Sequence, residues 1–170
     1  MEGRILDELI LEVVAIYLIA GIIISWIGWK LIRWAAGKLY FFWRASRSGV
    51  LLEDPEGLVE EVRWGCFRIS GKDFQKDIRC VGREPSSWAD RRGHLLEEDM
   101  ITGVWDQKLD VLVIGLGIDG AVQCPKIIQD RLRERGIPEI VVAPTVEACR
   151  MYNTYIRSGK RVALLAHGTC

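Results

Sequence analysis

The residues of this chain whose side chains could take part in chemistry are two histidines and one cysteine. His94 and His167 are its only histidines, and Cys170 follows His167 by three residues. An imidazole that takes the proton of a thiol leaves a nucleophilic thiolate, so these three residues are the candidate catalytic group. Residues an odd number of positions apart in a strand, however, point to opposite faces of the sheet. The spacing therefore favours a structural role, with His167 bonded to backbone groups and Cys170 packed as a small apolar residue.

A predicted loop over residues 82–94 carries further side chains that could bind a ligand. Two arginines precede His94 there, and the loop would fold over the end of the last predicted strand, the side on which open α/β sheets tend to hold ligands. The alternative is that these arginines pair with nearby carboxylates. Tyr152 and Asn153 fall on a predicted helix, where packing against the sheet is the simpler role. The candidate pocket residues are Trp88, Arg91, Arg92, Gly115, Gly117, Tyr152 and Asn153.

A glycine-rich motif follows the strand predicted at Val111–Ile114. Residues Gly115–Gly120 match the GxGxxG pattern of dinucleotide-binding loops. In such loops the next helix begins among the glycines and presents its amides to the pyrophosphate, whereas Pro125 places this helix start about five residues later. The pattern favours a tight connection between a strand and a helix, with nucleotide binding as an alternative.

Charge and cysteine content argue against several classes of function. The chain has 170 residues, with 23 lysines and arginines against 23 aspartates and glutamates. Residues 50–170 carry 17 basic and 19 acidic side chains, so nucleic acid is not an expected partner. The five cysteines form no CxxC pair, and no histidine lies at metal-ligand spacing. We therefore expect no metal site and no cofactor.

Residues 50–170 are predicted to form one soluble α/β domain. Its second half alternates strands and helices, at Val111–Ile114, Pro125–Arg135, Ile140–Ala143, Thr145–Ile156 and Val162–Ala166. This alternation implies a sheet with helices packed on it. Earlier, alternating apolar residues from Val62 lead through a turn to an extended run over Phe74–Val81, which favours a β-hairpin or a short meander. A short helix is expected at Glu97–Trp105.

Residues 1–49 are predicted to be a membrane anchor. An apolar run covers about residues 9–29, and Val13–Trp29 within it has no charged side chain. At a rise of about 1.5 Å per residue, a helix of this length crosses a hydrocarbon layer of roughly 30 Å. A cleaved signal peptide begins with basic residues, whereas this chain begins with acidic ones. The run is therefore interpreted as a retained transmembrane helix.

The residues that flank this span predict its orientation and its surroundings. Those before it are mostly acidic, and five basic residues follow between residues 30 and 47. The positive-inside rule then predicts a single-pass protein of the cell (inner) membrane, with its N-terminus outside and its C-terminal domain in the cytoplasm. The helix is expected to continue along the interface as an aromatic and basic collar, either as a simple anchor or as a docking surface. The candidate docking residues are Trp26, Trp29, Trp34 and Trp43.

Several short motifs together resemble one known family. They are Gly65–Gly71, Trp88 with Arg91, Gly93 and His94, the strand end Val113–Gly117, Thr145 with Ala148 and Tyr152–Asn153, and His167–Cys170. Their order and spacing over about residues 58–170 resemble the domain of unknown function 498 family, which has the Mth938-like fold. The chain departs from the family in two ways. Where the family has two tryptophans before its arginine, this chain has Trp88 alone, and a predicted transmembrane helix precedes the domain.

The resemblance implies a three-layer α/β fold around a mixed central sheet. It also implies relatives that include an assembly factor of mitochondrial NADH:ubiquinone oxidoreductase and an adipogenesis-associated protein. With the anchor, it predicts a non-catalytic accessory subunit or assembly factor of a respiratory or other energy-converting membrane complex, whose partners are membrane lipid and other subunits. The alternative is a small-molecule-binding protein or thiol-dependent enzyme with a pocket between Arg91–His94 and His167–Cys170.

Overall fold

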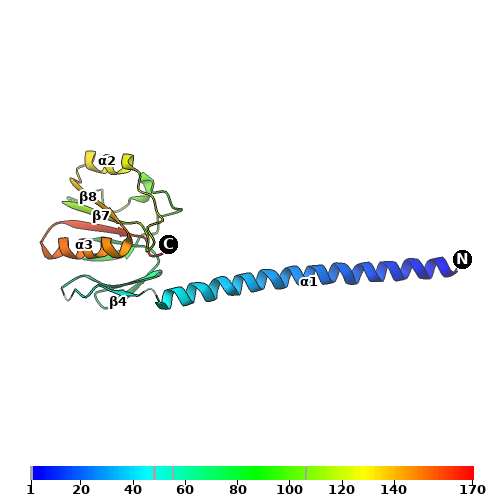
Figure 1. Cartoon of the computed structure of the whole chain (residues 1–170). Helices are drawn as coiled ribbons and strands as arrows, with labels where there is room; N and C mark the ends of the chain where they lie inside the picture. The colour runs from blue at the N-terminus through cyan, green and yellow to red at the C-terminus, as the bar shows by residue number, and fades with distance from the viewer. Residues whose placement is uncertain (1, 48, 55, 106) are drawn as a thin grey trace. The chain divides into compact units, whose positions relative to one another are not determined.

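The computed structural model describes residues 2–47, 49–54, 56–105 and 107–170, with side chains described for residues 17–39 and for the described residues from 49 onward. The chain divides into two compact units, residues 1–43 and residues 44–170 (Figure 1). The first unit is helical, and the second contains an α/β domain.

The first unit is formed by a single long helix, α1, whose bounds are Glu2–Arg47. Its stretch Tyr17–Leu39 is 23 residues long and apolar, and none of it is buried within the protein. By length and composition this stretch suits a membrane span, and a signal sequence near an N-terminus would meet the same requirement. The predicted span at about residues 9–29 overlaps it, and the side chains of residues 1–16 lie outside those described. The helix continues past residue 30, as predicted.

The second unit is built around a five-stranded sheet with the strand order β6-β5-β9-β7-β8. Its strands are β5 (Ile78–Val81), β6 (Glu84–Ser87), β7 (Val111–Gly115), β8 (Glu139–Ala143) and β9 (Val162–Ala166). Strand β7 is parallel to β8 and β9, whereas β5 runs antiparallel to β9 and β6. Every residue of β7 and β9 is buried, because both strands are apolar runs covered on both faces. The predicted α/β class and mixed sheet are confirmed.

A second sheet has four antiparallel strands in chain order. They are β1 (Val50–Leu51), β2 (Val59–Arg63), β3 (Cys66–Ile69) and β4 (Lys72–Gln75). The prediction of one extended run over Phe74–Val81 is wrong, because Lys76 has a φ of 69° and breaks the strand. The chain leaves the four-stranded sheet before this residue and enters β5 at Ile78. Asp77 therefore lies at the junction of the two sheets.

Two elements between the sheets also differ from the prediction. The predicted loop over residues 82–94 contains strand β6 at the edge of the five-stranded sheet, where Pro85 is tolerated because an edge strand pairs on one side only. The helix predicted at Glu97–Trp105 is limited to the 3₁₀ helix η1, Glu98–Met100. Gly103 has a φ of 70°, which is incompatible with a continuing helix.

Two helices and the second sheet cover the faces of the five-stranded sheet (Figure 1). Helix α3 (Thr145–Arg157) packs on β7 and β9 and also contacts β2 of the four-stranded sheet. One core therefore joins α3 to both sheets, with Phe67 and Tyr152 among its largest buried side chains. On the opposite face, helix α2 (Lys126–Glu134) packs with part of the segment 88–109 in a second core.

A single buried amide connects α3 to the four-stranded sheet. The Oδ1 atom of Asn153 accepts hydrogen bonds from the backbone amides of Leu58 and Val59, at 3.1 and 3.0 Å. Its Nδ2 atom donates to the carbonyl oxygen of Val59 at 2.8 Å. Asn153 has no exposed surface, so these three bonds satisfy backbone groups that water does not reach.

Replacing this amide should weaken the connection between helix and sheet. We expect Asn153→Ala to lower the free energy of unfolding by roughly 2–4 kcal/mol, because it leaves buried backbone groups without partners and opens a cavity. Urea denaturation of the full chain in detergent micelles, followed by tryptophan fluorescence, would measure the change. Thr154→Ala is the control, since Thr154 is the exposed neighbour on the same helix. Equal effects of the two substitutions would contradict the assignment.

Candidate functional site

The segment after β9 determines the geometry of the candidate site. Strand β9 ends at Ala166, and residues 167–170 fold back onto the glycine loop after β7. The amide of His167 donates to Gly115 O at 3.0 Å, and the carbonyl oxygen of Thr169 accepts from the amide of Ile118 at 2.9 Å. The argument that an odd spacing separates His167 from Cys170 across the sheet is therefore wrong, because neither residue belongs to the strand.

This turn brings one thiol against two imidazoles. The Sγ atom of Cys170 lies 3.1 Å from Nε2 of His167 and 3.1 Å from Nε2 of His94. The second contact joins residues that are 76 positions apart in the chain. The backbone of His94 is held in place by the amide of Gln123, which donates to the carbonyl oxygen of His94 at 2.7 Å. The loop that carries His94 and the end of β9 therefore meet at the sulfur.

Asp77 forms the other side of the site. Its Oδ1 atom lies 2.7 Å from Nδ1 of His167 and accepts a hydrogen bond from the amide of Gly168 at 3.0 Å. Its Oδ2 atom accepts a short hydrogen bond from Nε of Arg91. Burial opposes the ionisation of Asp77, but the bonds from His167, Arg91 and Gly168 outweigh burial and lower its pKa below the usual value of 3.8.

Asp77 was not among the residues predicted from the sequence. The one local signal for it is an acidic side chain inside the apparently continuous strand run Phe74–Val81. An unpaired charge is costly within a strand that is covered on both faces. An acidic residue at this position therefore indicates either that the strand is broken there or that the carboxylate is paired.

The two predicted pocket arginines have different roles. Arg91 pairs with Asp77, and its NH1 group donates to the carbonyl oxygen of Gly93 at 2.5 Å. Arg92 instead forms surface ion pairs with Glu97 and Asp99, at 2.9 and 2.5 Å. Arg91 thus connects the carboxylate behind His167 to the loop that carries His94.

Three other predicted pocket residues lie in the cores. Trp88 is 2% exposed, and its Nε1 donates to the carbonyl oxygen of Met100 at 2.6 Å. The hydroxyl of Tyr152 donates to the carbonyl oxygen of Gly82, which lies next to the first residue of β9. Cys170 lies beyond the other end of that strand. Burial raises the pKa of this phenol. Asn153 is the buried link between α3 and β2. The structure therefore groups Arg91, His94, His167 and Cys170, and it places these three apart from them.

The glycine loop is occupied by the protein itself. The amide of Gly117 donates to Oγ1 of Thr145 at 2.9 Å, and this hydroxyl donates in turn to the carbonyl oxygen of His167 at 2.7 Å. A Cβ atom on Gly117 would lie 1.6 Å from the carbonyl oxygen of Cys170. Helix α2 begins only at Lys126. Gly117 has no side chain, and this leaves room for residues 169–170. The amide of Gly117 is already bonded to Thr145, so it is not presented to a phosphate.

The remaining cysteines differ from Cys170 in their surroundings. Cys66, Cys80 and Cys149 are buried, and burial raises the pKa of each thiol. Cys124 is half-buried like Cys170, and burial raises its pKa to about 11. Among the described residues, no group of three or more histidines, cysteines, aspartates or glutamates has a geometry that would hold a metal ion. The site consists of a cysteine, two imidazoles and a carboxylate.

Comparisons with known proteins match the α/β domain. The family described as protein of unknown function (DUF498/DUF598) matches residues 59–167. A conserved hypothetical protein from Pyrococcus horikoshii is 25% identical, with a TM-score of 0.58 over 66% of this chain and 98% of that one. An outer membrane protein from Bartonella henselae is 21% identical, with a TM-score of 0.59 over 68% of this chain and 97% of that one. A third structure, MT938, is 22% identical, with a TM-score of 0.55 over 66% and 98%.

The carboxylate of Asp77 should stabilise the fold in a pH-dependent way. Because its pKa is lower in the folded chain than in the unfolded chain, its contribution is present above the unfolded value and is lost as the pH falls through the folded one. We expect Asp77→Asn to lower the free energy of unfolding by roughly 1–3 kcal/mol at pH 7, with the difference from wild type shrinking below about pH 4. Urea titrations between pH 3 and 7 would measure it.

The control for this prediction is Asp99→Asn, which removes an exposed carboxylate that pairs with Arg92. Such surface pairs contribute about 0–1 kcal/mol. A loss that is the same for both variants, or that stays constant over the whole pH range, would contradict the role given to Asp77.

Proposed function

This chain belongs to the DUF498/DUF598 family of proteins of unknown function, with a Mth938-like domain over residues 59–167, and from that starting point we propose that it is a membrane-anchored accessory or assembly protein. Its helix would hold the domain at the membrane and dock against the helices of a larger complex. The observation that carries the proposal is the exposed apolar stretch Tyr17–Leu39. The region of this chain that matches the family, residues 59–167, lies entirely after this stretch.

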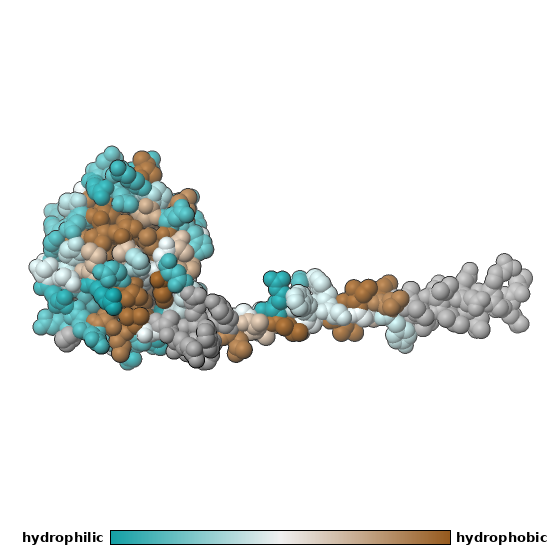
Figure 2. Space-filling view, in the orientation of Figure 1, coloured by the Kyte–Doolittle hydropathy of each residue, from teal (hydrophilic) through white to brown (hydrophobic). Residues whose placement is uncertain are grey.

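The length and surface of this stretch support anchoring. Its 23 residues correspond to about 34 Å of helix, more than the roughly 30 Å of a hydrocarbon layer. Figure 2 shows apolar side chains, in brown, along the described part of the helix. Exposed apolar surface of this extent is costly in water and requires lipid or protein to cover it.

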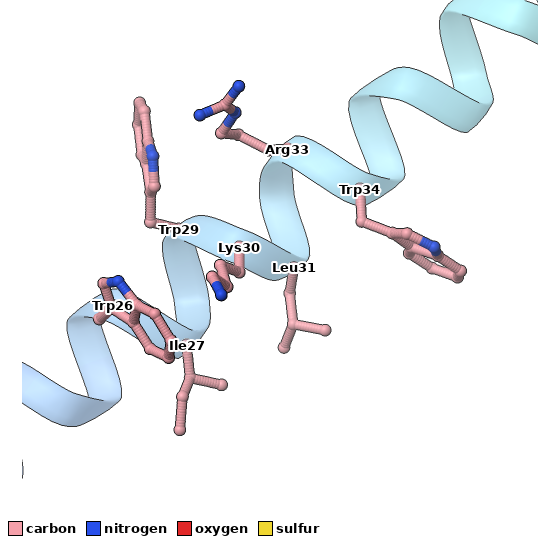
Figure 3. Close-up of a pocket in the computed structure, with 7 residues that line it drawn as sticks. All are labelled: Trp26, Ile27, Trp29, Lys30, Leu31, Arg33 and Trp34. Carbon is pink, nitrogen blue, oxygen red and sulfur yellow. The ribbon is translucent and has the colours of Figure 1, made fainter.

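One part of the helix surface has the chemistry of a docking face. A hollow along it is lined by Trp26, Ile27, Trp29, Lys30, Leu31, Arg33 and Trp34 (Figure 3). Ile27 and Leu31 point to one side of the helix, and Trp29 and Arg33 point to the other. Trp34, one further helical step on, extends the row of Ile27 and Leu31 at helical spacing. The side chain of Trp43, the fourth predicted docking residue, lies outside the described residues.

Tryptophans and cations near the end of the span also suit the headgroup level. The Nζ atom of Lys30 lies 3.9 Å from the ring centroid of Trp26, and that of Lys38 lies 4.5 Å from the ring centroid of Trp34. Such pairs place an apolar ring and a charge together, as the membrane interface favours. The basic residues after the span support an orientation with the N-terminus outside the inner membrane and the domain in the cytoplasm.

The partner that we propose is another subunit of a membrane complex, in addition to lipid. The resemblance in sequence implies a respiratory or other energy-converting complex. Within a bilayer, an apolar face does not by itself drive association, so side-chain packing must supply the affinity. The large side chains of Leu31 and Trp34 are suited to that role, because they offer a wide contact area with few rotatable bonds.

Purification from native membrane would test the docking role. We expect a partner at stoichiometric yield in mild detergent, and we expect the double substitution Leu31→Ala and Trp34→Ala to reduce the copurified partner at least tenfold. Ile22→Ala is the control, because Ile22 is exposed and apolar but lies outside this hollow, nine residues before Leu31 and so on the opposite side of the helix. Recovery of the chain alone, or equal losses in both variants, would overturn the proposal.

The anchor itself has a separate test. Since we infer that the helix is retained, the chain in the membrane fraction should have its full mass and should resist extraction by alkaline carbonate. A peptide that includes residues 5–30 should be detectable by mass spectrometry of that fraction. A mature chain that begins after the apolar stretch would instead identify this helix as a cleaved signal sequence.

A further inference from the structure

We propose that Cys170 is an acyl-accepting nucleophile, with His167 as its proton acceptor and with Asp77 and Arg91 as positioning residues. This inference goes beyond the docking role, which depends on the helix alone, and it would give the α/β domain a chemical activity of its own. The observation behind it is the contact of one thiol with two imidazoles, one of which is held by a carboxylate.

The hydrogen bond to Asp77 selects the form of His167 that can take a proton. Because a carboxylate only accepts hydrogen bonds, Nδ1 of His167 carries the hydrogen at the 2.7 Å contact. The Nε2 atom of the neutral ring then presents its lone pair to Sγ of Cys170, 3.1 Å away, and to the hydroxyl of Thr169, 3.0 Å away. The imidazolium that forms on proton transfer is stabilised by the same carboxylate, which is the arrangement of a nucleophile, base and orienting acid.

The positions of both imidazoles depend on Arg91. Its guanidinium binds Oδ2 of Asp77 and the carbonyl oxygen of Gly93, so that one side chain holds the carboxylate behind His167 and the residue before His94. The side chain of Arg91 is 14% exposed and that of Asp77 is 13% exposed, so their ion pair is largely shielded from water. Arg91 contacts neither the sulfur nor a reacting atom, and its role is to keep the two halves of the site together.

The thiol is accessible to a reagent from outside. Cys170 is half-buried and His94 is exposed, whereas His167 is 2% exposed. The base is thus held on the inner side of the sulfur, and the outer side meets solvent through His94. The Nε2 atom of His94 is placed to donate a hydrogen bond to the sulfur and stabilise the thiolate before an electrophile arrives. Among the residues that the structure describes, no hydrogen bond joins any of the four other cysteines to an imidazole.

The step that we propose is acyl transfer from an ester or a thioester. The thiolate of Cys170 attacks the carbonyl carbon, a C–S bond forms, and the bond from that carbon to the leaving oxygen or sulfur breaks with its electron pair. The proton taken up by His167 passes to the leaving group. The products are an S-acyl cysteine and an alcohol or a thiol, with no oxidant or reductant required. Disulfide chemistry is less well supported, because no second cysteine contacts Cys170 among the described residues.

Selective alkylation is the first test, with Cys124 as an internal control. Both thiols are half-buried, but burial raises the pKa of Cys124 to about 11. With iodoacetamide at pH 6.5, full-length protein in detergent micelles should be labelled at Cys170 at least about tenfold faster than at Cys124. His94→Gln and Asp77→Asn should each move the pH profile of Cys170 alkylation to higher pH. Gel filtration and circular dichroism would confirm that both variants are folded.

The second test uses p-nitrophenyl acetate as an acyl donor. The full chain should release a burst of nitrophenolate equal in amount to the protein, and peptide mass spectrometry should find one acetyl group on Cys170. Cys170→Ser should abolish the burst, and Cys124→Ser should leave it unchanged. Acetylation spread over lysines, or alkylation of Cys170 no faster than that of Cys124 with an unchanged pH profile in His94→Gln, would overturn the proposal. Neither result would affect the docking role, which is read from copurification.

Discussion

The carboxylate of Asp77 is the interaction on which the arrangement of the α/β domain most depends. It lies where the chain passes from the four-stranded sheet into the five-stranded one, and it binds His167, the amide of Gly168 and Arg91. One acidic group therefore connects the junction of the sheets, the segment after β9 and the loop before His94. Because these bonds outweigh the cost of burial, the charge is stable in a place where an unpaired carboxylate would be costly.

The close approach of backbone segments around this carboxylate requires small residues. Gly168 lies against Lys76, since a Cβ atom there would be 2.2 Å from its carbonyl oxygen, and Gly117 lies against residues 169–170. Thr145, at the start of α3, bridges the amide of Gly117 and the carbonyl of His167 with a single buried hydroxyl. The glycine motif thus explains how the chain can turn back after β9. That turn places the sulfur of Cys170 beside two imidazoles.

The helix and the domain present two kinds of surface with separate physical requirements. The stretch Tyr17–Leu39 has an apolar surface that lipid or a partner helix can cover, and its tryptophans and lysines are suited to an interface. The domain has its own two cores and buries every residue of β7 and β9. The docking role and the thiol chemistry that we propose therefore rest on different residues, and each can fail without the other.

The sequence by itself was sufficient for the features that depend on local pattern. The buried strands β7 and β9 and the helices α2 and α3 were predicted within a few residues, because apolar runs and helical periodicity are read over short segments. The predicted membrane span overlaps the apolar stretch of α1. The short motifs also indicated the family, which the match over residues 59–167 confirms. An edge strand with Pro85 was missed, since its local composition is that of a loop.

Only the tertiary structure decided which polar residues meet. His94 contacts Cys170 although the two are 76 positions apart in the chain, and Asp77 contacts His167 although they are 90 positions apart. No local pattern encodes such pairs, because they follow from the order of strands in the sheet and from the turn after Ala166. The spacing of His167 and Cys170 suggested opposite faces of a strand, and the structure reversed this because the strand ends before either residue. The sequence determined which reactive groups the chain carries, and the fold determined that one thiol, two imidazoles and a carboxylate share one site.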